Sequence, residues 1–167
     1  MTARFLVVMG VLAAALSGCG YYGTSSRTAK DIKSISVPFF ENRTSEPNLE
    51  IIVTERVIDN LVADNTLSVE DESGADAVLE GAIVSFKNEP FSFNRDLNAE
   101  EYHVVVSVEA SLRKRESDEP LWEKQIIRGD GSYFVDSTEE GRTYEDALAE
   151  AIKEITDRIL NLTVQDW

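Results

Sequence analysis

The residues from Tyr102 to Leu112 alternate between apolar and polar side chains, and they form the clearest strand pattern in this chain. Because successive side chains of a strand point to opposite faces, the alternation predicts a strand with one buried face and one solvated face. Such a strand needs neighbouring strands and an apolar layer over its buried face. The pattern therefore constrains the chain to a fold of at least two layers.

Two predicted helices can supply that layer. The C-terminal one begins at Thr143-Tyr144-Glu145-Asp146, which resembles a capping box. Its apolar residues then recur at helical spacing: Tyr144, Ala147, Leu148, Ala151, Ile152, Ile155, Ile159 and Leu162. An earlier helix is predicted from Pro47 to about Asp64, with Asn65 as its C-cap.

The remaining strands are predicted at residues 32–40, 67–70, 76–86 and 121–129. Residues 76–86 are apolar on both faces, which indicates a central strand. We predict a loop over residues 88–99 and a break or bulge at Gly129-Asp130-Gly131. The order is strand, helix, four strands, helix. It predicts an α+β fold in which two helices pack on one face of a mixed, mostly antiparallel sheet.

The N-terminus has the pattern of a bacterial lipoprotein. After Arg4, the uncharged run Phe5–Ala15 is too short to span a bilayer and fits the apolar region of a signal peptide. Leu16-Ser17-Gly18-Cys19 then matches the lipobox, in which the cysteine receives the lipid. We predict a signal peptide over residues 1–18, lipidation of Cys19, a tether over residues 19–30 and one domain over residues 31–167. The alternative is a secreted protein with a chance cysteine.

The position after the lipidated cysteine bears on sorting. Many bacteria retain lipoproteins in the inner membrane by an Asp there, and this chain has Gly20. We therefore expect attachment to the outer membrane through the N-terminal lipid.

Composition excludes several classes of function. The chain has 31 acidic and 16 basic residues and a net charge of −15, which disfavours nonspecific binding to nucleic acid. Lipidation of Cys19 leaves no thiol, and the single histidine, His103, is expected at the surface. The chain shows no nucleophile elbow and no phosphate-binding or dinucleotide-binding pattern. We expect a binding or assembly protein with no cofactor and no metal, and not an enzyme.

Two segments are candidates for binding. Arg113, Lys114 and Arg115, here called the basic cluster, lie at a predicted hairpin end and suit contact with phosphate oxygens. The alternative is a charged turn that discourages edge pairing. Phe91, Phe93 and Arg95, here called the aromatic segment, lie in the predicted loop and suit docking to a partner. Folding back over the core is the alternative.

Several segments in order resemble the lipopolysaccharide-assembly lipoprotein family, LptE. The resemblance covers nearly all of the chain after residue 18, and its segments are Cys19-Gly20-Tyr21-Tyr22, the stretch Ile35–Thr44, Glu46–Glu50 with Val53–Glu55, Ala75–Gly81, the strand from Tyr102, Leu121-Trp122-Glu123 and the Ala-rich last helix. It implies a lipoprotein that sits in the lumen of an LptD-type outer-membrane β-barrel as plug and assembly partner. The complex then inserts lipopolysaccharide into the outer leaflet.

The resemblance also implies that lipopolysaccharide itself is a candidate ligand, because some members of the family bind it through basic residues. Here the charge of −15 repels lipid A phosphates over long range, with the basic cluster as the local exception.

Two other functions compete with this one. A lipoprotein activator of a periplasmic enzyme, such as a peptidoglycan synthase, has a lipobox and a small α/β domain, but its tether is usually long. At about 3.5 Å per residue, the tether over residues 19–30 reaches only a few tens of ångströms. The third candidate, a hydrolase of envelope polymers, has no motif in its favour.

Overall fold

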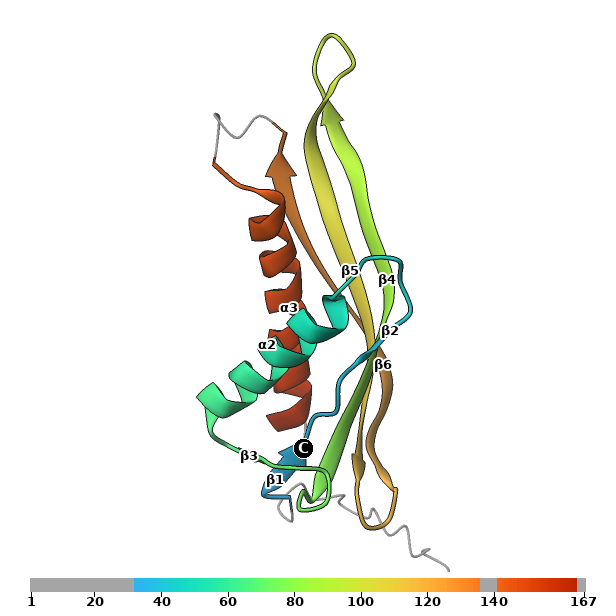
Figure 1. The fold of residues 1–167 in the computed structure, drawn as a ribbon, viewed down its shortest axis with the longest axis vertical. Coiled ribbons are helices and arrows are strands. Elements are labelled where there is room, and N and C mark those ends of the chain that lie inside the picture. Colours follow the sequence, from blue (N-terminus) through green and yellow to red (C-terminus); the bar gives the residue numbers. More distant parts are fainter. Residues whose placement is uncertain (1–31, 136–140, 165–167) are drawn as a thin grey trace, which may run out of the picture.

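The computed structural model describes residues 32–135 and 141–164, and it holds two helices and a six-stranded sheet (Figure 1). The elements are β1 (Ser34–Ser36), β2 (Glu41–Asn42), α2 (Leu49–Asp64), β3 (Ser68–Val69), β4 (Ala77–Phe93), β5 (Ala99–Lys114), β6 (Pro120–Phe134) and α3 (Tyr144–Val164). The predicted signal peptide, Cys19 and the tether lie outside the described residues.

The sheet combines a long antiparallel meander with short parallel strands. β4, β5 and β6 pair antiparallel in that order, and the strand order is β3-β1-β4-β5-β6, with β2 also on β4. β1 and β2 both run parallel to β4, and β3 runs parallel to β1. The α+β class is confirmed, but the sheet is mixed and not mostly antiparallel. The reason is that α2 forms a crossover, which returns the chain in a parallel sense.

Both helices cover one face of the sheet, as predicted (Figure 1). The alternation in β5 places Val104, Val106, Val108, Ala110 and Leu112 in the core, each at most 1% exposed. The stripe of α3 packs on them and on β6. The side chain of Asn60 on α2 donates to Thr156 Oγ1 on α3 at 3.0 Å, which joins the two helices. No helix in the described residues is long and apolar enough to cross a membrane.

The helix ends follow the predicted chemistry. Asn65 adopts the left-handed conformation (φ 57°), and its N–H donates to the Leu61 carbonyl, as expected of a C-cap. Thr143 and Asp146 bond each other reciprocally at the start of α3, so the capping box is confirmed. α2 begins at Leu49 and not at Pro47, because Asn48 has a φ of 65° and cannot continue a right-handed helix.

The predicted break at Gly129-Asp130-Gly131 is wrong, since β6 runs through it with a regular register against β5. The two glycines serve close packing against α3. A Cβ at position 131 would lie 2.9 Å from the backbone C and Cα of Ala147, and one at position 129 would lie 2.9 Å from the backbone C of Ala151. These glycines therefore let the helix approach the strand at backbone distance.

The predicted loop over residues 88–99 is also wrong. β4 continues to Phe93 and β5 begins at Ala99, so that only residues 94–98 form the turn. The pairing between these strands carries register shifts around Pro90 and Ser92. Pro90 is tolerated because it lies opposite Tyr102, whose backbone groups face β6, so that position 90 donates no hydrogen bond to β5.

The predicted strand over residues 32–40 is shorter than expected. Only Ser34–Ser36 pairs as β1, and Pro38 lies outside it. Phe40 then turns into the core at 2% exposure, and its N–H donates to Thr54 Oγ1 at 3.0 Å. The backbone therefore leaves the sheet after β1 and rejoins β4 as β2.

Candidate functional site

The two segments predicted to bind partners lie at opposite ends of the sheet (Figure 1). The aromatic segment spans the end of β4 and the turn to β5, and the basic cluster lies at the end of β5 and the start of the turn to β6. β5 joins these ends with 16 residues, which corresponds to about 54 Å at ~3.4 Å per residue. The structure therefore has two separate candidate surfaces.

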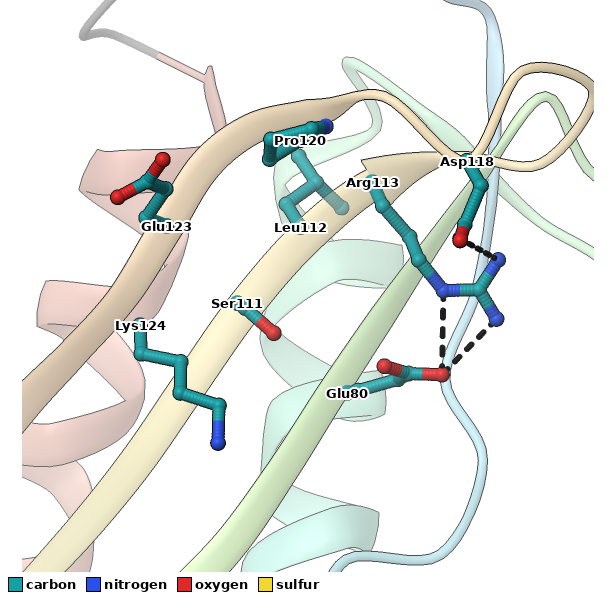
Figure 2. A pocket seen from close by; sticks show the side chains of 8 residues that line it. All are labelled: Glu80, Ser111, Leu112, Arg113, Asp118, Pro120, Glu123 and Lys124. Carbon is teal, nitrogen blue, oxygen red and sulfur yellow. Dashed lines mark hydrogen bonds and ion pairs between the residues drawn. The ribbon is translucent and has the colours of Figure 1, made fainter.

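Arg113 of the basic cluster is held by two carboxylates (Figure 2). Its Nε and Nη2 donate to Glu80 Oε1 at 3.2 and 2.9 Å, and its Nη1 lies 3.1 Å from Asp118 Oδ1. The hydrogen bond that Arg113 donates to Glu80 raises the pKa of Arg113. The charge of this arginine is thus balanced within the protein.

The other two residues of the basic cluster behave differently. Arg115 donates its Nε to the Ala75 carbonyl at 2.6 Å, and its backbone N–H donates to the Asp76 carbonyl at 2.9 Å. The side chain of Lys114 has no hydrogen bond or ion pair with the described residues. Because Arg113 and Lys114 are successive residues of β5, their side chains point to opposite faces. The basic cluster is therefore spread around the end of the sheet.

A shallow groove of about 760 Å³ runs beside Arg113 on the face that carries no helices (Figure 2). Its charged residues are Glu80, Arg113, Asp118, Glu123 and Lys124. Three acids against two bases make its lining acidic, which opposes binding of a free phosphate.

The same face carries a second set of paired charges. Glu109, which is 23% exposed, lies 3.0 Å from Lys124 Nζ and 3.7 Å from Arg43 Nη1. Arg43 also pairs with Glu41 at 2.7 Å. The helix-free face near the basic cluster is thus polar, with most of its charges matched.

The aromatic segment is exposed at the far end of the sheet. Phe91 and Phe93 are 61% and 56% exposed, and Phe91 stacks on His103 with ring centroids 4.0 Å apart. Both phenylalanines belong to β4 and neither lies in the turn. Folding back over the core, the alternative weighed for this segment, is not what the structure shows.

The turn that follows is closed by hydrogen bonds to Asn94 and adds an apolar residue that the sequence analysis missed. Asn94 Oδ1 accepts from the N–H groups of Asp96 and Asn98, both at 3.0 Å. This leaves Leu97 at φ 62° and 82% exposed. Val135, at the end of β6, is 60% exposed. Leu97 could have been found from the sequence, because it is an apolar residue inside a short turn that contains two asparagines.

Arg95, also in this turn, is exposed and makes no ion pair with the described residues. The aromatic segment thus presents two phenylalanines and a cation, extended by Leu97.

No metal-binding cluster lies in the described residues. No group of three or more His, Cys, Asp and Glu side chains there is placed to hold a metal ion. The ring of His103 stacks on Phe91, and no acidic partner is described for it. His103 lies on the helix-free face of β5 and is half-buried against that ring.

Comparison with known proteins identifies relatives of the whole domain. A family model described as LptE, lipopolysaccharide-assembly, matches residues 32–163. A search of curated proteins found no significant match.

Solved structures share the fold at low sequence identity. The hypothetical protein CT253 of Chlamydia trachomatis has a TM-score of 0.58 at 11% identity, covering 81% of this chain and 99% of that one. An uncharacterized lipoprotein B of Nitrosomonas europaea gives 0.51 at 15% identity, with 80% and 86% covered. The PelC dodecamer of Paraburkholderia phytofirmans gives 0.52 at 16% identity, with 78% and 86% covered. At such identities these structures support the fold alone.

Proposed function

The chain belongs to the LptE family of lipopolysaccharide-assembly proteins, and from this membership we propose that it is the plug and assembly partner of an LptD-type outer-membrane β-barrel. In this role it helps the barrel to insert lipopolysaccharide into the outer membrane. The observation that carries the proposal is the family match over residues 32–163, which reaches from before β1 to the last turn of α3.

The shape of the sheet supports a place inside a barrel. A strand of 16 residues is about 54 Å long. The apolar band of an outer-membrane barrel is about 25 Å tall, so a sheet of this length is long enough to run through the whole lumen. The interior of such barrels is polar. The helix-free face, with the matched charges of Arg43, Glu109 and Lys124, suits such a lining.

The anchor is the second part of the proposal. We propose that residues 1–18 are removed as a signal peptide, that Cys19 is lipidated and that the lipid sits in the outer membrane. The described chain starts next to β1, at the end where Asp76 accepts the N–H groups of Lys33 and Arg115. A tether over residues 19–30 would therefore hold the basic cluster near the anchoring membrane and the aromatic segment far from it.

Direct contact with lipopolysaccharide phosphates through the basic cluster stays a prediction. Arg113 and Arg115 already have acceptors within the protein. Lys114 is the member of the cluster whose ammonium group has no described partner, so we expect it to contribute most to such a contact. The proposed role is non-catalytic and needs no cofactor.

Affinity purification of the full-length, lipidated protein from its own outer membrane tests the proposal. We expect an LptD-type barrel to co-purify at close to one-to-one stoichiometry, as measured by mass spectrometry. Recovery of a periplasmic synthase without any barrel would contradict the proposal and favour the activator function.

A further inference from the structure

β6 forms one edge of the sheet, and its register shows which backbone groups face away from β5. The pairing is regular from Glu101↔Phe134 to Ala110↔Gln125. The N–H of Val135 donates inward to the Glu100 carbonyl at 3.0 Å, whereas that of Asp130 points outward to Glu154. Hydrogen-bonded and outward-facing residues alternate in an antiparallel pair. The even-numbered residues of β6 therefore point their N–H and C=O groups away from the sheet.

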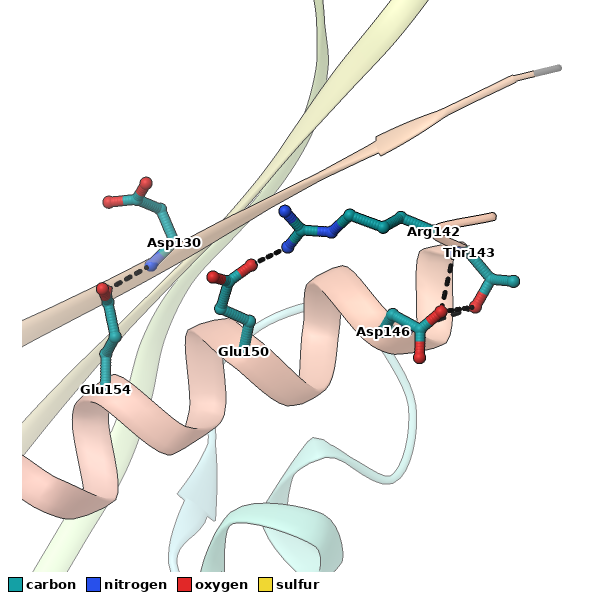
Figure 3. A network of polar contacts seen from close by, with 6 residues as sticks. All are labelled: Asp130, Arg142, Thr143, Asp146, Glu150 and Glu154. Atoms are coloured by element: carbon teal, nitrogen blue, oxygen red, sulfur yellow. Dashed lines mark hydrogen bonds and ion pairs between the residues drawn. The ribbon is translucent and has the colours of Figure 1, made fainter. Parts of the chain in front are cut away.

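One of these outward groups has a partner on α3 (Figure 3). The N–H of Asp130 donates to Glu154 Oε2 at 3.1 Å, while the Asp130 carboxylate points away from the helix. No strand or side chain in the described residues pairs with the outward N–H groups of Ile126 and Arg128. On the opposite side of the sheet, β3 has only two residues, and β4 beyond Ile83 forms a second open edge that contains Pro90. A long unpaired edge is a template for an added strand.

A groove of about 550 Å³ runs along this edge between β6 and α3. Ile126, which is 64% exposed, lines it together with Arg128 and Arg158. Neither arginine forms an ion pair with the described residues, whereas Asp157 is paired with Lys153 at 2.6 Å. The two acids of the groove are engaged elsewhere, Glu154 with the N–H of Asp130 and Asp157 with Lys153, so the two arginines are its charged groups without a described partner.

We propose that the outward edge of β6 at Ile126 and Arg128 accepts an extended acidic segment of the barrel partner as an additional strand. This inference rests on the proposed function. Backbone pairing supplies the affinity, and carboxylates of the added strand pair with Arg128 and Arg158. A second copy of this chain suits the edge less well, because each copy carries a charge of −15 and the same two arginines.

Hydrogen exchange resolved to single amides, on the purified complex and on the free protein, tests the inference. In the free protein we expect fast exchange at Ile126 and Arg128 and slow exchange at Ile127 and Gly129, which bond β5. In the complex, exchange at Ile126 and Arg128 should slow by about tenfold or more. A bound barrel that leaves these two amides unprotected overturns the strand pairing while the proposed function stands. If no barrel binds, both proposals fall.

A pair of variants separates the backbone from the charge. Arg128→Pro removes the outward N–H together with the arginine charge and leaves the hydrogen bonds to β5 in place, and proline is tolerated at such an edge position. Arg128→Ala removes the charge and keeps the N–H. We expect Arg128→Pro to retain about tenfold less barrel than Arg128→Ala. Equal retention by the two variants overturns the strand pairing. If Arg128→Pro does not fold, the exchange result decides alone.

Discussion

The ring of Phe40 lies directly against the backbone of Gly81 in β4. A Cβ at position 81 would lie within 2.6 Å of the ring Cζ and still closer to two other ring atoms. The N–H of Phe40 is meanwhile fixed by Thr54 Oγ1 of α2. The contact between the first helix and the central strand therefore depends on the missing side chain at position 81.

Gly81→Ala should destabilise the domain by about 2 kcal/mol, because the added methyl group displaces a buried ring that is held from both sides. Urea unfolding followed by circular dichroism measures the change. Gly74→Ala is the control, since a Cβ there meets the flexible end of Glu70 at 3.2 Å and the Asp71 carbonyl oxygen at an ordinary contact distance of 3.8 Å. A loss as large for Gly74→Ala would show that the effect does not come from the Phe40 contact.

Gly131→Ala should be more damaging, at about 3 kcal/mol, because its Cβ would press on the backbone of Ala147 and push α3 away from β6. Ser132→Ala changes the neighbouring residue, whose side chain lies on the face of the sheet away from α3, and it should change stability by less than about 0.5 kcal/mol. Thermal unfolding of both variants checks the difference. Equal stability of Gly131→Ala and the wild type would mean that helix and strand are further apart than described.

Asp76 should make the stability of the domain depend on acid pH. The N–H of Lys33, and then that of Ser34, bond its carboxylate and lower the pKa of Asp76 below 3.8. The stabilisation is therefore complete above the unfolded-state pKa and is lost as pH falls through the lower folded-state value. The melting temperatures of wild type and Asp76→Asn should differ by a constant amount above about pH 5 and converge below about pH 4.

Asp59→Asn, at an exposed carboxylate of α2, is the matched control for Asp76→Asn. We expect its melting temperature to stay close to that of the wild type across the same range. A difference for Asp76→Asn that persists unchanged at the lowest pH would exclude the linkage.

Phe93→Ser combined with Leu97→Ser tests the aromatic segment as a docking surface. Both side chains are more than half exposed, so stability should change by less than about 1 kcal/mol. Co-purification of the barrel should fall by about tenfold if the segment is an anchor of the interface. Val62→Ser, at a similarly exposed residue of α2, should leave co-purification unchanged. Unchanged recovery with the double variant would remove the aromatic segment from the interface.

The sequence was most informative where period and burial agree. The alternation of β5 and the helical stripe of α3 predicted the core residues Val104, Val108, Ile152 and Ile155, because a half-buried element must place its apolar residues on one side. The capping box at Thr143 was equally readable, because it depends on two residues three positions apart.

The segments that were predicted wrongly share a cause: they contain glycine and proline, which are typical of turns but also occur inside strands. Gly129 and Gly131 resemble a turn, yet their lack of a side chain lets α3 pack closely on β6. The position of α3 cannot be read from the local sequence. Pro90 resembles a loop residue, yet it fits within a long hairpin because its position makes no hydrogen bond to β5. The contacts of Arg113 with Glu80 join residues far apart in the sequence, so the balanced charge of the basic cluster could not be foreseen.

The order of elements has a consequence for biogenesis. The apolar face of β5 is covered by α3, which is the last described element of the chain. If the protein is exported from its N-terminus, the sheet cannot bury this face until α3 has crossed the inner membrane. Val104, Val106 and Val108 would then form an exposed, aggregation-prone apolar surface in the periplasm during that interval. Such an intermediate is a natural client for a periplasmic holdase chaperone.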